Sequence, residues 1–369
     1  MKSYPFIHVD AELRNAVEAD VIAGAVLIAA GGAGRRHEFA VGRAQITPLE
    51  RPLSSSTSFD LASLTKVLAT TWLAMKLSVA GRLDLDAPLE NLLPGYYPTD
   101  KRSLTVRLLM CHAAGLPSGL RLRDDLPPDA GGTAPRRSVI ERFLEAPIVA
   151  EPGRQTLYSD IGPILVGDLL ERLTLTTGLA RLDAICADEL YAPLGLRDTF
   201  YIHLDDPLPG ALRPPETFAA TEDCRWRGRV LSGEVHDENA HLLRGVAGHA
   251  GLFSTAHDLE RIACAYLGDA DIGIDGATLR RLTSPQAMAP DSNRAFGWDK
   301  PGDDGPSGNR FSARAYGHKG FTGTSLWIDP DLNGYVILLT NRVHPTREDR
   351  GFLALRPRLH DLVLAALAG

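Results

Sequence analysis

The sequence Phe59-Asp-Leu-Ala-Ser-Leu-Thr-Lys66 places a serine hydroxyl three residues before a lysine amine. If a helix begins at Ser63, this spacing stacks the side chains of Ser63 and Lys66 on one face, a single turn apart. A hydroxyl beside an amine is a nucleophile beside a base. The residues that follow favour a helix, because apolar side chains recur at near-3.6 spacing up to Val79 and Gly81 then ends the run.

The pattern Ser-x-x-Lys is short, so it needs support from other parts of the chain. With six lysines and 18 serines, roughly 0.3 matches are expected by chance. The simplest alternative is an ordinary serine at a helix N-terminus followed by a surface lysine. Partners further along the chain decide between the two interpretations.

The length, composition and net charge limit the classes of protein to which this chain can belong. A chain of 369 residues is long enough for a large core and two subdomains. Its net charge of -7 argues against a nucleic-acid binder and against recruitment to anionic lipid by charge. The first ten residues show no secretory signal, and no window has the roughly 18 apolar residues of a membrane helix.

The cysteines do not form a metal or disulfide pattern, because they are scattered without a Cys-x-x-Cys pair. They are Cys111, Cys186, Cys224 and Cys264. We therefore expect reduced thiols in a cytoplasmic protein, or a periplasmic or secreted protein if a signal was removed. Neither nucleic acid nor membrane is an expected partner, and the oligomeric state is left open.

Strand patterns lie near both ends of the chain, and helical patterns lie between them. Apolar strand-like runs occur at 23–30, 37–44, 325–328 and 334–340, with Asn333-Gly334 as a hairpin turn. Helices are expected at 10–19, capped by Asp10, and at 162–174, 259–267 and 351–368. The expected fold is α/β plus α: an antiparallel sheet flanked by helices, built from both chain ends, with a mostly helical insertion.

The predicted subdomain boundaries lie where strand patterns give way to helical patterns and where strand patterns return. Residues 1–84 and 236–369 form an α/β subdomain, and residues 85–235 form a mostly helical subdomain.

Two further stretches carry groups suited to catalysis. Glu151-Pro-Gly-Arg-Gln-Thr-Leu-Tyr-Ser-Asp160 is a turn that leads to a tyrosine, just before a helix. Alone, it is read more simply as a half-buried tyrosine and a capping aspartate. Tyr316-Gly-His-Lys-Gly-Phe-Thr-Gly-Thr-Ser325 is rich in glycine, so a backbone N–H there can approach a substrate oxygen. Its alternative is a plain strand and turn.

Together these stretches resemble the serine β-lactamase and penicillin-binding-protein superfamily, in its class C-like branch. That branch includes family VIII carboxylesterases, DD-peptidases and some peptidoglycan amidases. Its signature order is Ser-x-x-Lys, Tyr-x-Asn/Ser and Lys/His-x-Gly. Here the order is met by Ser63–Lys66, Tyr158–Asp160 and His318–Gly320. The stretches 109–116 and 248–255 also match, and the resemblance runs from about residue 12 to 368.

The resemblance implies a β-lactamase/transpeptidase-like fold and a role for each motif residue. Ser63 would be the acylated nucleophile, and Lys66 would accept or relay its proton. We expect a cationic neighbour and partial burial to keep Lys66 neutral, as a base requires. Tyr158 would be the second acid or base. The N–H groups of Ser63 and Phe321 would form the oxyanion hole, and His318 would take the place of the third motif's cation.

Two motif positions depart from the β-lactamase pattern. Asp160 stands where β-lactamases favour asparagine, and an ionised carboxylate only accepts hydrogen bonds. It would either pair with Lys66 and keep it charged, or bind a donor on the substrate. His318 replaces a lysine, so its positive charge is weak near neutral pH. Both changes favour an esterase or amidase over an efficient β-lactamase; Lys319 and Gly320 complete the expected substrate-binding strand.

A histidine-rich segment, His236-Asp-Glu-Asn-Ala-His241, is followed by His249 and His257. Its spacing is not that of a zinc protease, so we expect no metal and no cofactor. Asp237, Asn239 and His249 are expected to shape the rim of the cleft or to satisfy loop hydrogen bonds. With the stretch 321–329, this segment looks most like the branch containing N-acetylmuramoyl-L-alanine amidases of cell-wall recycling.

The expected function is that of a serine hydrolase forming an acyl-enzyme on an ester or amide. The substrate would be a peptidoglycan-derived muropeptide or a small carboxylic ester, with weak or no β-lactamase activity. One alternative is a non-catalytic ligand-binding or sensor protein on the same fold. Another is a metal-dependent hydrolase at the histidine-rich segment.

Overall fold

A six-stranded sheet forms the largest layer of the computed structural model, which describes residues 4–32, 34–130, 136–174, 181–302 and 305–368. Its order is β3-β2-β1-β11-β10-β9, and each neighbouring pair is antiparallel. These strands are β1 (Gly24–Gly31), β2 (Arg35–Gln45), β3 (Arg51–Pro52), β9 (Tyr316–Lys319), β10 (Ser325–Asp329) and β11 (Gly334–Thr340). Because β1 pairs with β11, the predicted sheet built from both chain ends is confirmed.

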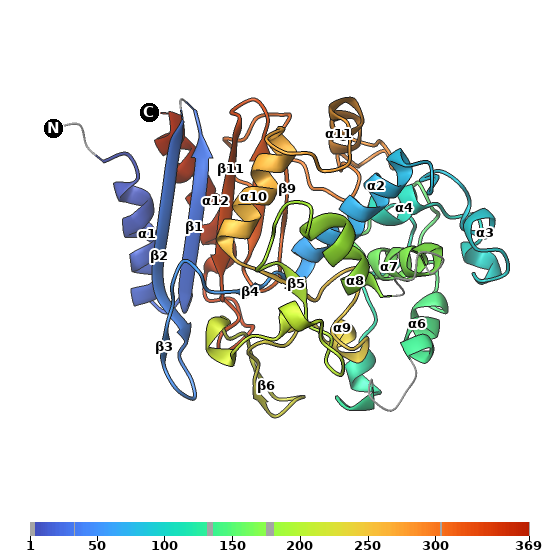
Figure 1. Ribbon diagram of the computed structural model, residues 1–369, viewed down its shortest axis with the longest axis horizontal. Helices are drawn as coiled ribbons and strands as arrows, with labels where there is room; N and C mark the ends of the chain where they lie inside the picture. The colour runs from blue at the N-terminus through green and yellow to red at the C-terminus, as the bar shows by residue number, and fades with distance from the viewer. Residues whose placement is uncertain (1–3, 33, 131–135, 175–180, 303–304, 369) are drawn as a thin grey trace.

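Helices cover both faces of this sheet (Figure 1). One face carries α1 (Ile7–Glu18) and α12 (Phe352–Ala368), and the other carries α10 (Ala256–Leu267). Along β1, Leu27 belongs to the core under α1 and α12, whereas Val26 and Ile28 belong to the larger core on the opposite side. Successive strand residues point to opposite faces, so an apolar run suits a strand covered on both sides.

The rest of the chain is mostly helical and lies beside the sheet (Figure 1). Its helices are α2 (Trp72–Val79), α3 (Leu89–Leu92), α4 (Val106–Met110), α6 (Arg136–Leu144), α7 (Ile161–Thr174), α8 (Leu182–Cys186), α9 (Glu238–Leu242) and α11 (Gly276–Thr283). The short strands are β4 (Phe59–Asp60), β5 (Phe200–Tyr201), β6 (Asp223–Cys224), β7 (Arg229–Val230) and β8 (Leu252–Ser254). Among the described helices, none is both long and apolar enough to cross a membrane.

Two local expectations were wrong. Helix α1 begins at Ile7, and Asp10 does not cap it, because the Asp10 carboxylate instead bonds His37 at 2.8 Å. The helix at Ser63 is not a continuous α-helix: a 3-10 turn covers Ala62–Leu64 and a π-helix covers Lys66–Thr71 before α2 begins. The division at residues 85 and 236 stays a prediction.

Candidate active site

Ser63 follows a turn that a buried carboxylate holds in place. The two oxygens of Asp60 accept hydrogen bonds from the N–H groups of Ala62, at 2.8 Å, and His236, at 2.6 Å. Ala62 adopts a left-handed conformation with φ of 47°. A non-glycine residue is rarely found there and persists only where its surroundings enforce it. The fold therefore fixes the backbone that presents the Ser63 hydroxyl.

The ammonium group of Lys66 is buried and has three partners. It donates hydrogen bonds to Ser63 Oγ at 2.8 Å and to the His249 carbonyl at 3.2 Å. It also lies 2.7 Å from a carboxylate oxygen of Asp160. The predicted meeting of Ser63 and Lys66 is confirmed, although a 3-10 turn followed by a π-helix brings it about. Single π-turns are frequent at functional sites.

Lys66 is charged at neutral pH. Burial by itself lowers the pKa of Lys66, but the charge of Asp160 and hydrogen bonds with Asp160 and Tyr158 raise it more, so the net pKa lies above its ordinary value. The expectation of a neutral amine is wrong for this resting state, because Asp160 provides a carboxylate where asparagine would provide none. Of the two alternatives for Asp160, the structure shows the pairing with Lys66, and the raised pKa of Lys66 agrees with a charged amine.

Tyr158 lies against the same lysine. Its ring centroid is 5.2 Å from Lys66 Nζ and 5.6 Å from the guanidinium carbon of Arg294, and both distances fit cation–π contact. Loss of water around its hydroxyl raises the pKa of Tyr158, and the charge of Lys66 opposes this rise. As a whole residue, Tyr158 is 38% exposed. Tyr158 is therefore a protonated phenol at neutral pH, open to the cleft on one side.

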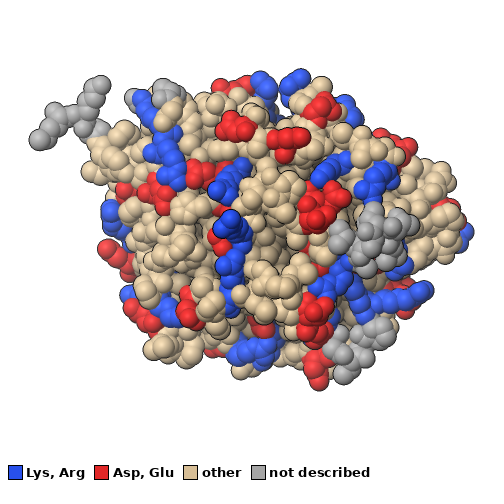
Figure 2. All heavy atoms as spheres, in the orientation of Figure 1, with Lys and Arg blue, Asp and Glu red and all other residues tan. Residues whose placement is uncertain are grey.

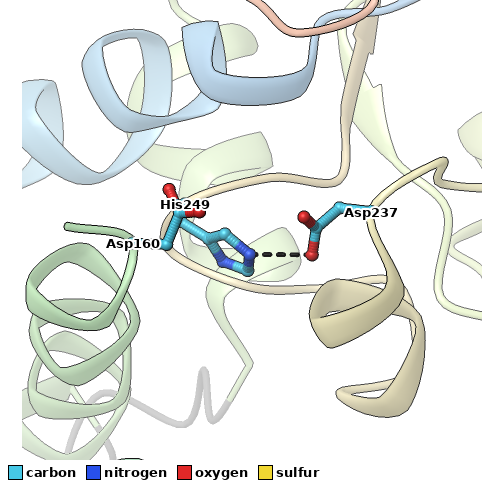
Figure 3. A group of neighbouring side chains, drawn as sticks. All are labelled: Asp160, Asp237 and His249. Carbon is cyan, nitrogen blue, oxygen red and sulfur yellow. Dashed lines mark hydrogen bonds and ion pairs between the residues drawn. The ribbon is translucent and has the colours of Figure 1, made fainter. Parts of the chain in front are cut away.

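Asp160, Asp237 and His249 converge from three different segments (Figure 3). His249 Nε2 lies 2.9 Å from Asp237 Oδ1, and this contact lowers the pKa of Asp237 despite burial, which by itself raises it. One ligand atom from each residue lies within 4.8 Å of the others. This geometry resembles a metal-ligand set, but Lys66 already holds Asp160 and His249 holds Asp237. The contacts Lys66–Asp160 and His249–Asp237 therefore hold the three side chains of this cluster together.

The other residues of the histidine-rich segment have separate tasks. Asn239 donates to the Leu120 carbonyl at 2.8 Å, so it satisfies a loop and does not line the cleft. His236 lies 3.1 Å from Glu222, whereas His241 and His257 contact other partners away from Asp160. The segment therefore does not gather its histidines around one point.

His318 does not supply the third motif's positive charge. It is fully buried, and its Nδ1 lies 2.9 Å from the Lys319 carbonyl. Burial lowers the pKa of His318 to about 3, although Asp299 acts in the opposite direction. The ring is neutral, and the cleft is lined by Lys319 instead. The expected cation at His318 is wrong because burial keeps its imidazole neutral, although the ring lies 6.1 Å, centroid to centroid, from that of Tyr158.

The backbone of the third motif closes against the Ser63 turn. A side chain at Gly320 would place its Cβ 2.3 Å from the Leu61 carbonyl oxygen, so glycine is required there. Within the described residues, no hydrogen bond uses the N–H of Ser63 or that of Phe321. Both residues line the cleft. Two free donors at this place agree with the predicted oxyanion hole, which stays a prediction.

These residues surround a cleft of about 430 Å³. One part of its wall is acidic, with Asp160, Asp237 and Glu238. Another part is cationic, with Lys319, Arg342, Arg347 and Arg356. On the molecular face seen in Figure 2, acidic and basic side chains are interspersed, so the net negative charge is not gathered in one region of that face.

Three of the cationic residues, Arg342, Arg347 and Arg356, were not anticipated from the sequence, and two of them lack an acidic partner among the described residues. Arg356 is only 4% exposed and makes no ion pair or hydrogen bond within the described residues. Burial and the charge of Arg342 together lower the pKa of Arg356 to about 10, although Asp299 and Asp349 act in the opposite direction. Arg342 lies over the Phe321 ring, 4.6 Å from its centroid, without an acidic partner in the described part of the chain. No local pattern marks them, since they lie after β11 and within α12.

A model of the β-lactamase family matches residues 9–356. The chain belongs to the β-lactamase family. An N-acetylmuramyl-L-alanine amidase of Bacillus subtilis (strain 168) is 35% identical over 325 residues, which are 80% of this chain and 71% of that protein. A putative D-alanyl-D-alanine carboxypeptidase of Salmonella heidelberg (strain SL476) is 30% identical over 327 residues, covering 81% and 73%.

Solved structures agree with this β-lactamase-family fold. EstCE1, a hydrolase with promiscuous acyltransferase activity, has a TM-score of 0.72 at 21% identity and covers 99% of both chains. The predicted family and fold class are confirmed. The chain is accordingly a serine hydrolase of the β-lactamase family, whose relatives include proteins named amidase and carboxypeptidase.

Proposed function

We propose that this protein hydrolyses an amide bond in a peptidoglycan fragment through an acyl-enzyme on Ser63. The observation that carries the proposal is the contact between Lys66 Nζ and Ser63 Oγ, 2.8 Å, within a cleft that also holds Tyr158 and Asp160. The amidase from Bacillus subtilis, at 35% identity, supports the choice of an amide between a muramyl group and a peptide. Cell-wall recycling is the corresponding cellular role.

In the first step, Ser63 Oγ attacks the carbonyl carbon, and its proton passes to the pair formed by Lys66 and Tyr158. The N–H groups of Ser63 and Phe321 donate hydrogen bonds to the developing oxyanion. Collapse of the tetrahedral intermediate breaks the C–N bond, and Tyr158 gives a proton to the leaving amine. Water then attacks the acyl-enzyme with the same pair as base, and Ser63 recovers its proton.

The charge of Lys66 makes this chemistry dependent on pH. Because the resting lysine carries a proton, the Lys66–Tyr158 pair must lose one before it can accept the proton of Ser63. The rate should therefore rise as pH increases above neutrality.

The cationic wall supports a substrate with carboxylates. Arg342 and Arg356 are buried guanidinium groups that form no direct ion pair among the described residues, with Asp349 acting on both only from a distance, and a bound anion would stabilise them. Fragments of peptidoglycan peptides carry carboxylates. Asp160, in contrast, accepts donors only, so a substrate amide N–H or hydroxyl suits that side better than a β-lactam carbonyl.

The test is release of peptide from an N-acetylmuramyl-L-alanyl peptide by the wild type, by Ser63→Ala and by the control Ser103→Ala. Ser103 is exposed and outside the cleft lining. We expect Ser63→Ala to lose all turnover and Ser103→Ala to match the wild type. Equal turnover by Ser63→Ala and wild type would overturn the acyl-enzyme, and turnover of simple esters without any amide cleavage would overturn the substrate.

A further inference from the structure

We propose that His112 is a positioning residue that holds Tyr158 in its reactive orientation. The inference rests on the proposed function, because it takes Tyr158 as a catalytic group. His112 belongs to the stretch 109–116, whose match to the family pattern has no chemical task so far.

His112 forms hydrogen bonds with the backbone on both sides of Tyr158. The His112 carbonyl accepts a hydrogen bond from the N–H of Leu157 at 2.8 Å. Its ring nitrogen Nδ1 accepts one from the N–H of Ser159 at 3.0 Å. The imidazole also lies against the phenol ring, with centroids 4.5 Å apart and planes at 30°. The carbonyl of His112 thus holds the backbone before Tyr158. Its imidazole holds the backbone after Tyr158 and packs against the phenol ring.

His112 has a backbone conformation that is uncommon for a residue with a side chain. It follows the last turn of α4 with a left-handed φ of 57° and is 2% exposed. Glycine is the usual residue at such a position because it adopts a left-handed backbone without strain. A histidine there accepts backbone strain and fills the space beneath Tyr158. The strain is maintained because the imidazole is packed and hydrogen-bonded.

The hydrogen bond from Ser159 requires an unprotonated Nδ1. Burial lowers the pKa of His112 well below its ordinary value, and the neighbouring Arg294, Lys66 and His318 lower it further. The ring is therefore neutral over the working pH range, with its proton on Nε2, and the acceptor is always available.

The other neighbours of the Tyr158 ring do not replace these contacts of His112. Lys66 and Arg294 lie 5.2 and 5.6 Å from its centroid. Cations at such distances attract the ring face but do not fix the backbone that carries it. A displacement of a reacting group by about 1 Å lowers a rate on the order of 10²-fold.

Asparagine offers a selective replacement. In His112→Asn, the side-chain oxygen takes the place of Nδ1, and asparagine tolerates a left-handed backbone better than most residues. The acceptor for Ser159 is kept and the stacked ring is lost. In His112→Ala, both are lost. His257→Asn is the matched control, because His257 is partly exposed and contacts Glu38 away from the cleft.

The readouts are kcat and KM on a hydrolysed substrate, the pH profile of kcat, and the second-order rate at which a fluorophosphonate labels Ser63. We expect His112→Ala to lower kcat and labelling on the order of 10²-fold with KM little changed. His112→Asn should recover part of this loss, and His257→Asn should behave as wild type. The alkaline rise of kcat should move in the His112 variants, since Tyr158 belongs to the titrating pair.

A double-mutant cycle makes the test decisive. If His112 acts through Tyr158, removing its side chain has no further effect on labelling in a Tyr158→Phe background. The same loss in both backgrounds, or full kcat in His112→Ala, would overturn the inference. If His112→Ala does not fold, His112→Asn carries the same cycle. Absence of amide turnover by the wild type would count against the proposed function alone, because the labelling rate needs no substrate.

Discussion

Lys66 and Asp160 form a buried ion pair, with Nζ 2.7 Å from the carboxylate oxygen, beside the Ser63 hydroxyl. β-Lactamases favour asparagine at the position of Asp160, so their active sites lack this ion pair. It keeps the lysine charged at rest and removes a donor from the cleft wall. Ser63 and Lys66 lie where the Ser-x-x-Lys motif predicts. The charge of Lys66 is what distinguishes this site.

Replacing Asp160 by asparagine should shift the pH dependence of activity to lower pH. The carboxylate holds the pKa of Lys66 above its ordinary value, whereas burial alone lowers it. Without Asp160, the Lys66–Tyr158 pair should lose its proton about 1–3 pH units earlier. The measurement is kcat against pH for wild type and Asp160→Asn, with Asp129→Asn as a surface control. A rise that stays at the same pH, or moves upward, contradicts the role given to the pair.

Gly320→Ala should destabilise the protein and lower its activity. The added Cβ would lie 2.3 Å from the Leu61 carbonyl oxygen and 2.1 Å from Thr324 Oγ1, so the third motif must move away from the Ser63 turn. We expect a loss of about 1–3 kcal/mol in the free energy of unfolding. Gly210→Ala is the control, because a Cβ there meets no atom within 4 Å. Denaturant unfolding that shows equal effects of the two substitutions would speak against this close approach.

Stability should fall as pH drops below the ordinary pKa of histidine. Burial lowers the pKa of His318 to about 3 in the folded protein, so the unfolded chain takes up a proton first. The stabilisation is complete above pH 6.5 or so and is lost as pH falls toward 3, amounting to about 2 kcal/mol between pH 7 and pH 5.

The variant His318→Asn isolates this effect, because its amide N–H can still donate to the Lys319 carbonyl but does not titrate. Unfolding free energies measured at pH 7 and pH 5 should differ less in His318→Asn than in the wild type. An equal or larger dependence in the variant means that His318 is not buried neutral.

The fold and the centre of the site could be predicted because they depend on local signals. Apolar runs near both ends predicted the strands that pair as β1 and β11, and the order of three motifs predicted that Ser63, Lys66 and Tyr158 meet. Charge states could not be predicted, because they depend on which carboxylate lies next to which cation after folding. The charge states of Lys66 and His318 were both predicted wrongly for this reason. The pKa of each side chain depends on burial and on partners far away in sequence.

The cationic wall was missed for a related reason. Arg342 lies in the loop after β11 and Arg356 lies within α12, and nothing in their local sequence distinguishes them from surface arginines. Their burial without acidic partners in the described part of the chain is a tertiary property. The same holds for His112, whose importance appears only when its contacts with residues 157–159 are seen.

Ser63 should form a covalent acyl-enzyme. Intact-mass spectrometry of the protein, quenched during turnover of a slowly hydrolysed acyl ester and followed by peptide mapping, detects this species. We expect a mass increase equal to the acyl group, located on the peptide that contains Ser63 and missing in Ser63→Ala. An adduct of the same amount in Ser63→Ala, or turnover by the wild type with no adduct under conditions where deacylation is slow, would contradict it.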